Sequence, residues 1–232
     1  MNLGAITANL TIKMVRAIIF DMDGVIIDSE PVYGKWLAMF LESQGVAVPK
    51  TELNKIPGIA SQDFVKKLEL WWKNAGKPYK TGKEINQMFD KYSDGFPISY
   101  KNILTPNIKE VMEWLRQSHY KIAVASSSPM KNITEVLSET KLNTFVDIKV
   151  SGENFANSKP NPEIYNFTVK KLGLEKAECI AVEDSSYGIQ AAANARLKVI
   201  AKKDDRFGFD QSLADYHIDN LLQIIDILKC ME

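Results

Sequence analysis

The sequence predicts an α/β protein, in which a doubly wound, Rossmann-like parallel sheet carries an inserted all-helical block. Three observations indicate this class. From about residue 105 onward, short apolar runs that suit buried strands alternate with segments of helical periodicity. A further apolar run, 17–20, stands near the start, and residues 31–101 show helical periodicity with almost no strand-like alternation. We therefore expect an α/β core of residues 1–30 and 102–232 and a helical domain of residues 31–101.

Length and composition limit the function classes. The 232 residues suit one core with an insertion, and 45% hydrophobic with 25% charged residues is ordinary for a globular protein. Lysine plus arginine equal aspartate plus glutamate at 29 each, so the overall charge favours neither nucleic acid nor an anionic membrane surface. Any site for an anion must therefore be local.

Targeting signals and cysteines point to the cytoplasm. Residues 1–12 lack the basic start and continuous apolar centre of a signal peptide, and we expect them to be an extension without a function of its own. No apolar stretch approaches the roughly 18 residues of a membrane span. Cys179 and Cys230 form no disulfide framework or metal-binding spacing, which favours a reduced compartment.

The first strand and the helical block follow in order. The strand 17–20 ends at Asp21-Met22-Asp23-Gly24, and Asp28-Ser29-Glu30-Pro31 is typical of a helix start. Helical spacing continues from Pro31 until Gly45 and recurs in two later segments. These segments are 61–74 and 82–93, with loops at 53–58 and 76–79. The tryptophans of this block, Trp36, Trp71 and Trp72, are interpreted as packing residues because aromatic side chains chiefly contribute buried area.

After Thr105-Pro106 helices and strands alternate. The expected helices are 107–117, 130–139, 162–172, one that contains Ile189, Ala192 and Ala193, and 220–229; the expected strands are 121–125, 146–150, 179–182 and 197–201. Strands separated by helices of about ten residues indicate a parallel sheet with right-handed crossovers.

Polar residues follow several of these strands. Asp21 and Asp23 end the first, Ser126 ends the strand 121–125, and Glu183-Asp184 end the strand 179–182. Lys159 stands in a loop. Because parallel strands of the same sense end along one edge of a sheet, we expect these groups to converge.

The converging groups suit phosphoryl transfer. A hard divalent cation would relieve the repulsion between neighbouring carboxylates. Magnesium prefers carboxylate oxygens and the oxygens of a substrate phosphate as ligands. Lys159 and Ser126 supply a positive charge and a hydroxyl to the outer oxygens of a phosphoryl group. One of the two aspartates can then attack phosphorus while the other moves a proton, with the metal screening the anionic charges.

Four ordered segments resemble the motifs of the haloacid dehalogenase (HAD) superfamily of phosphotransferases. They are Phe20 to Val25, Ala125-Ser126-Ser127, Ser158 to Pro162, and Val182 to Ser185. The similarity covers nearly the whole chain. The helical block is similar to the mobile cap of the subgroup that contains β-phosphoglucomutase and small phosphatases, which makes 31–101 the expected cap.

The resemblance implies a role for each motif residue. Asp21 would be the nucleophile and Asp23 the general acid/base. Mg²⁺ would be held by Asp21, the backbone carbonyl of Asp23 and Asp184, with Glu183 either a ligand or positioned behind the ligands. The phosphate would be held by Ser126 and Lys159, with the accessible amides of Gly24 and Ser127. Dehalogenation is disfavoured, because members that cleave carbon–halogen bonds lack the aspartate that Asp23 represents here.

Two departures separate the alternatives within the family. Tyr33 stands where β-phosphoglucomutases have a histidine, and Ser61 stands about where they have an arginine that grips a second phosphate. We therefore predict a Mg²⁺-dependent phosphatase for a small organic monophosphate of the sugar phosphate or phosphoglycolate type, with the turn 58–61 facing the substrate.

Two further interpretations stay open. One is a mutase of hexose 1-phosphates, and the other is a phosphorylatable binding or switch module without turnover. We expect a monomer and leave a dimer open.

Overall fold

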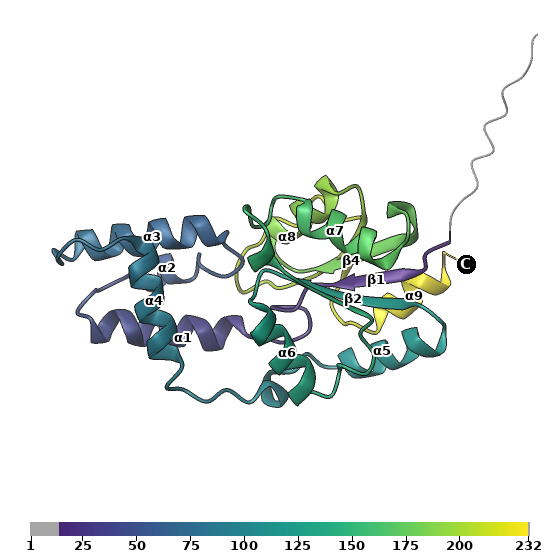
Figure 1. Cartoon of the computed structure of the whole chain (residues 1–232), viewed down its shortest axis with the longest axis horizontal. Helices are drawn as coiled ribbons and strands as arrows, with labels where there is room; N and C mark the ends of the chain where they lie inside the picture. Colours follow the sequence, from purple (N-terminus) through teal and green to yellow (C-terminus); the bar gives the residue numbers. More distant parts are fainter. Residues whose placement is uncertain (1–13, 232) are drawn as a thin grey trace, which may run out of the picture.

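A parallel sheet with helices on both faces lies at one end of the molecule, and a helical insert lies at the other (Figure 1). The computed structural model describes residues 14–231, so the expected extension 1–12 lies outside the described residues. The sheet has six strands in the order β3-β2-β1-β4-β5-β6, and every neighbouring pair is parallel. This arrangement places β1 at the centre of the sheet.

The strands are short and mostly buried. They are β1 (Ala17–Phe20), β2 (Lys121–Ser126), β3 (Ile148–Ser151), β4 (Cys179–Glu183), β5 (Lys198–Lys202) and β6 (Tyr216–Ile218). The core helices are α5 (Ile108–Gln117), α6 (Met130–Glu139), α7 (Glu163–Leu172), α8 (Ser186–Asn194) and α9 (Gln223–Lys229). Each predicted strand and core helix has its counterpart, with ends that differ by a few residues.

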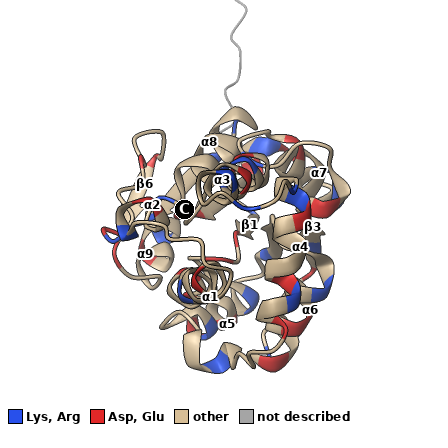
Figure 2. Ribbon diagram, turned by 90° about the vertical axis from the view of Figure 1, so that its left-hand side faces the viewer, with Lys and Arg blue, Asp and Glu red and all other residues tan. Residues whose placement is uncertain are grey.

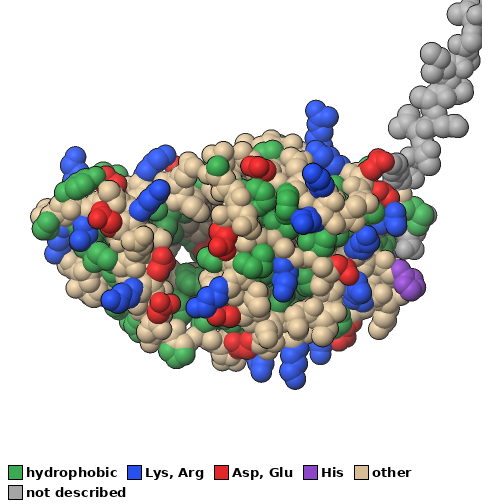
Figure 3. Space-filling model, viewed as in Figure 1, with side chains coloured by type: hydrophobic (Ala, Val, Ile, Leu, Met, Phe, Trp, Pro, Cys, Tyr) green, Lys and Arg blue, Asp and Glu red, His purple; other side chains and the backbone are tan. Residues whose placement is uncertain are grey.

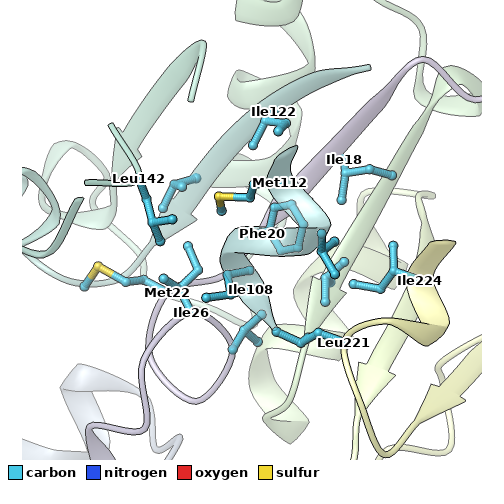
Figure 4. Packing of buried hydrophobic residues seen from close by; sticks show 14 of the residues in the cluster. Ile18, Phe20, Met22, Ile26, Ile108, Met112, Ile122, Leu142, Leu221 and Ile224 are labelled. Atoms are coloured by element: carbon cyan, nitrogen blue, oxygen red, sulfur yellow. The ribbon is translucent and has the colours of Figure 1, made fainter. Parts of the chain in front are cut away.

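The alternation of side chains along β1 divides the core into two layers. Ile18 and Phe20 pack into a cluster with residues of α5, α6 and α9 (Figure 4). Ala17 and Ile19 face the other cluster, which includes residues of α7 and α8. Successive residues of a strand point to opposite faces, so a run of four apolar residues fills both layers. Both faces of the sheet are therefore covered, as the doubly wound class requires.

The helical insert has a hydrophobic cluster of its own. It comprises α1 (Glu30–Ser43), α2 (Lys50–Leu53), α3 (Ser61–Asn74) and α4 (Gly82–Ser93). Trp71 and Trp72 are buried between these helices together with Phe40 and Leu68, and the indole of Trp72 donates to the carbonyl of Pro78 at 2.8 Å. These contacts agree with the interpretation of both tryptophans as packing residues. The predicted boundaries, 1–30 with 102–232 and 31–101, stay predictions.

One α-helix and one strand were not predicted. Helix α2 has four residues, none of them buried, and β6 has three residues, of which Ile218 alone is buried. Neither segment is long enough to show a period in the sequence. Strand β6 pairs in parallel with β5 and forms the edge of the sheet on that side.

Basic and acidic residues are mixed rather than segregated on the side of the molecule that Figure 2 presents. Figure 2 shows basic and acidic residues interspersed over the helices, in agreement with the equal numbers of the two kinds. Within residues 14–231, no helix has both the length and the apolar character needed to cross a membrane.

Candidate active site

The carboxyl ends of β1, β2 and β4 meet at one side of a cavity of about 390 Å³ between the sheet and the helical insert. A hollow between these two parts is visible in the space-filling view (Figure 3). The predicted site residues that line the cavity are Asp21, Asp23, Ser126, Ser127, Lys159 and Asp184. Glu183 and Gly24 lie behind this lining, so the structure brings the predicted residues together in two layers.

Lys159 lies between two acidic strand ends. Its Nζ is 2.6 Å from Asp21 Oδ1 and 2.6 Å from Glu183 Oε1, and it also donates to the carbonyl of Ala125 at 3.1 Å. Burial alone would lower the pKa of Lys159, but the adjacent Asp21 and Glu183 carboxylates raise the pKa well above its ordinary value. Lys159 is therefore a fixed cation at the carboxyl edge of the sheet.

Tyr165 of α7 holds Glu183 from the other side, and the sequence did not indicate this contact. The Tyr165 hydroxyl donates to Glu183 Oε1, and its ring lies 5.1 Å from Lys159 Nζ. Both side chains are buried, and Glu183 has no exposed surface. A tyrosine on an amphipathic helix is usually a packing residue, so only its buried position shows that it contacts an ionised pair.

Asp23 is surrounded by hydroxyl groups. Ser29 Oγ donates to Asp23 Oδ1 at 2.6 Å, and Ser128 Oγ and Ser126 Oγ donate to Oδ2 at 2.8 and 3.4 Å. Of these three serines, the sequence indicates Ser126 alone as a site residue. The run of serines at the end of β2 and the serine before α1 were the available signals. The three hydroxyls orient the Asp23 carboxyl group in the cavity.

Gly24 allows Asp184 to approach the first strand. A Cβ atom on Gly24 would lie 2.0 Å from Asp184 Oδ2, and the backbone has a φ of +82° there. Only glycine adopts this conformation readily and leaves the space free. Any side chain larger than hydrogen at position 24 is therefore excluded by the Asp184 carboxylate and by the positive φ.

Three acidic side chains are arranged closely enough to hold a metal ion. Ligand oxygens of Asp21, Glu183 and Asp184 all lie within 4.8 Å of one another, and all three residues are buried. Burial, and then the neighbouring carboxylates, raise the pKa of Asp184 well above its ordinary value, and burial with Glu183 and Asp23 raises the pKa of Asp21 to about 8, against the lowering effect of Lys159. When ionised, the three carboxylates and the single Lys159 ammonium carry two net negative charges. One divalent cation with a preference for oxygen ligands matches this set.

The helical insert contributes the opposite wall. Tyr33 and Ser61, the two departures noted in the sequence, both line the cavity, and so does the predicted turn 58–61. Glu30, at the start of α1, also lines it, and the Gly58 amide donates to Glu30 Oε1 at 3.1 Å. In the sequence, Glu30 is typical only of a helix start.

The comparison with protein families decides the assignment. A model described as haloacid dehalogenase-like hydrolase matches residues 18–202, which is most of the chain. The chain belongs to the haloacid dehalogenase-like hydrolases. This result confirms the predicted family and, with the parallel sheet, the predicted fold class.

Relatives of this haloacid dehalogenase-like hydrolase include phosphatases. The chain is 28% identical over 225 residues to hexitol phosphatase B of Escherichia coli strain K12, covering 92% of this chain and 96% of the relative. It is 27% identical over 193 residues to phosphoglycolate phosphatase of Aliivibrio fischeri, covering 78% of this chain and 81% of that relative. The crystal structure of β-phosphoglucomutase from Clostridium difficile has a TM-score of 0.75 at 22% identity and covers 94% of this chain and 97% of that one. The relatives confirm the predicted enzyme class, a phosphatase of this family, while the solved structure shows the fold alone.

Proposed function

We propose that this enzyme is a Mg²⁺-dependent phosphatase that hydrolyses a small organic phosphomonoester through an aspartyl-phosphate. The observation that carries the proposal is the placement of Asp21, Asp23, Lys159 and Asp184 around one cavity. We further propose that residues 31–101 act as the cap, since their turn 58–61 lies over the cavity. A small phosphorylated metabolite is the substrate class that the cavity size and the phosphatase relatives support.

In the first step Asp21 acts as the nucleophile. A carboxylate oxygen of Asp21 bonds to phosphorus while the bond from phosphorus to the ester oxygen breaks. Asp23 donates a proton to the departing oxygen, so the alcohol leaves neutral. The hydrogen bonds from Ser29 and Ser128 hold the Asp23 carboxyl group in a defined orientation for this transfer.

In the second step water replaces the alcohol. The oxygen of a water molecule attacks phosphorus while Asp23, now ionised, accepts a proton from that water molecule. The bond between phosphorus and Asp21 breaks, which regenerates the free Asp21 carboxylate. Lys159 and the Ser126 hydroxyl bind the outer phosphoryl oxygens in both steps, with the Ser127 amide as a further donor. The predicted Gly24 amide is not available for this role, because it donates to the carbonyl of Ile27 at 2.7 Å and Gly24 does not line the cavity. Lys159 is kept in place by Glu183, which is itself held by Tyr165.

Asp21, Asp184 and the backbone carbonyl of Asp23 would hold Mg²⁺, which supplies charge neutralisation between the anionic nucleophile and the anionic phosphate. We place Glu183 behind these ligands as a positioning residue. Its Oε1 already accepts from Lys159 and Tyr165, and Glu183 does not line the cavity.

A mutase is the second candidate, supported by the fold of β-phosphoglucomutase. A bisphosphate-activated mutase needs a cation for the second phosphate, and Lys159 is the only lysine or arginine among the described residues that line the cavity. This observation favours water as the final acceptor. The non-enzymatic alternative, a phosphorylatable switch, is disfavoured by Lys159 and the cap.

We also propose a cytoplasmic location, supported by the two cysteines, Cys179 and Cys230, which are free thiols.

The test is phosphate release from a panel of sugar phosphates, phosphoglycolate, nucleotides and pyrophosphate, with Mg²⁺ or with a chelator. We expect Mg²⁺-dependent release from one compound class, and a loss of more than about a thousandfold in Asp21→Asn with the fold intact. Near wild-type activity in Asp21→Asn would contradict the nucleophile. Bisphosphate-activated conversion of a hexose 1-phosphate to its 6-phosphate would favour the mutase, and a long-lived aspartyl-phosphate without hydrolysis would favour the switch.

A further inference from the structure

Apart from Glu30, the described residues that line the cap side of the cavity are neutral. Apolar side chains such as Leu37, Phe64 and Phe89 line it together with the neutral polar groups of Tyr33 and Asn86. Within the described part of the chain, the only lysine or arginine of the lining is Lys159, which is paired with acidic strand ends on the core side. A leaving group on the cap side therefore meets no positive charge.

Glu30 is the one charged group among the described residues that line this side of the cavity. It begins α1, where the chain leaves the core, and its Oε1 accepts from the Gly58 amide at 3.1 Å. Among residues 14–231, none donates a hydrogen bond to Glu30 Oε2. Gly58 is itself held against the core, since a Cβ atom there would lie 2.8 Å from Ser185 Cβ. Glu30 therefore has a fixed position and a second oxygen available to a ligand.

The surroundings of Glu30 add negative charge. Burial raises the pKa of Glu30 to about 7, and the carboxylates of Asp23, Asp28 and Asp204 contribute in the same direction. Arg206, whose guanidinium binds Asp28 at 2.7 and 3.0 Å and Asp204 at 2.8 Å, is a single cation and offsets only part of the charge of these three carboxylates. At pH 8 the Glu30 carboxylate is mostly ionised, which sets the pH of the test below.

We propose that Glu30 is a specificity-determining residue, which selects a neutral, hydroxylated leaving group and rejects one that carries a second anionic group. Its carboxylate accepts hydrogen bonds from ligand hydroxyls, and the absence of a cation among the described residues of the cap side leaves a second carboxylate or phosphate without a partner. The substrate class is then the monophosphate of a neutral polyhydroxy compound rather than a bisphosphate or a phosphorylated acid such as phosphoglycolate. This inference rests on the proposed phosphatase function.

Two substrates that differ at one carbon test the proposal. Glucitol 6-phosphate and 6-phosphogluconate share their chain and phosphate, but the first ends in a hydroxymethyl group and the second in a carboxylate. We would measure kcat/KM for both at pH 8 with Mg²⁺, in the wild type and in Glu30→Gln. The amide side chain introduced in this variant keeps a carbonyl oxygen for the Gly58 amide and removes the charge.

We expect the wild type to prefer the polyol phosphate by more than about tenfold, and Glu30→Gln to reduce that preference by about tenfold, mainly through a lower KM for the acid. Asp63→Asn is the matched control, because Asp63 is a cap carboxylate paired with Lys66 outside the cavity lining. It should leave the ratio unchanged. Glu30→Asp, which keeps the charge, should retain the wild-type preference and serves as the second variant if Glu30→Gln does not fold.

Three results would overturn the inference. These are a wild type that hydrolyses both compounds equally, a Glu30→Gln that keeps the wild-type ratio, and an equal loss on both substrates, which would make Glu30 merely structural. Failure of the proposed function is distinct from these results: the wild type would then release no phosphate from any member of the panel with Mg²⁺ present, and the inference would fall with it.

Discussion

Replacing Lys159 by methionine should make the stability of the metal-free protein strongly dependent on pH. The Lys159 side chain is 8% exposed and lies 2.6 Å from two carboxylates, of which Glu183 has no exposed surface. Methionine has a similar length and no charge, so the variant removes the cation with little change in packing. The buried carboxyl groups are then left without their partner.

The magnitude follows from the cost of an unpaired buried charge. Removing one partner of a buried pair costs about 3–5 kcal/mol when the other stays ionised. The alternative is to bind a proton, which costs about 1.4 kcal/mol for each pH unit above the ordinary carboxyl pKa of about 4. Protonation therefore costs about 2 kcal/mol at pH 5.5 and more than the unpaired charge at pH 8. We expect a loss of about 2 kcal/mol at pH 5.5 and about 3–5 kcal/mol at pH 8.

The sign follows from proton binding. Without Lys159 the folded variant binds one proton more than the folded wild type, and the unfolded chain has released this proton above about pH 4. The stability of the variant therefore falls relative to wild type as the pH rises. Urea unfolding with a chelator, at pH 5.5 and pH 8, measures both values. Lys131→Met is the control: Lys131 is 80% exposed and 3.9 Å from Glu135, and its loss should change stability by less than about 0.5 kcal/mol.

A loss below about 1 kcal/mol at pH 8, or one that is equal at the two pH values, would refute this reasoning. It would mean that the Asp21 and Glu183 carboxyl groups find other partners or water when Lys159 is removed. Phosphatase activity gives an independent readout, and Lys159→Met should lower it by more than about a hundredfold because a fixed cation for the phosphoryl oxygens is lost.

Two more predictions concern the metal and the first turn. In the metal-free protein the pKa of Asp21 is raised to about 8 and that of Asp184 is also raised, so the stability of the folded state falls as the pH rises from about 4 toward 8. Because Mg²⁺ binds the ionised carboxylates, it should raise Tm more at pH 8 than at pH 6. An equal shift of Tm at the two pH values in calorimetry would contradict this. Gly24→Ala should cost about 1–3 kcal/mol and most of the activity, because its Cβ atom would lie 2.0 Å from Asp184 Oδ2 at a φ of +82°. The control is Gly173→Ala, at a φ of +66° with no atom within 4 Å of the new Cβ, which should cost stability without loss of turnover.

The position of the motif residues in the fold could be predicted because each is identified by the few residues beside it in the sequence. A run of apolar residues ending in Asp21 and Asp23 is a strand end, whatever surrounds it, and parallel strands must end along one edge. The predicted convergence of Asp21, Ser126 and Asp184 on one cavity follows from this rule, whereas Lys159 stands in a loop and was assigned to the same site by its motif. The apolar strands determine the core for the same reason.

Other features of the site depend on segments far apart in sequence. Tyr165 contacts Glu183 at the end of β4, although α7 packs mainly against β2 and β3. The hydroxyls of Ser29 and Ser128 meet at Asp23 from two segments about a hundred residues apart. Neither contact leaves a periodic signal, since a single serine or tyrosine is compatible with many surroundings.

The sequence by itself determined the fold class, and it predicted which residues meet at the carboxyl edge of the sheet, since hydrophobic periodicity and strand direction are properties of a local segment. Only the tertiary structure decided that Glu183 lies behind the cavity lining, that β6 completes the sheet and that Glu30 stands on a cap side whose described residues include no cation. These features are set by burial and by the distance between groups on separate elements. The energy of a charge depends on both, and neither can be obtained from the spacing of residues along the chain.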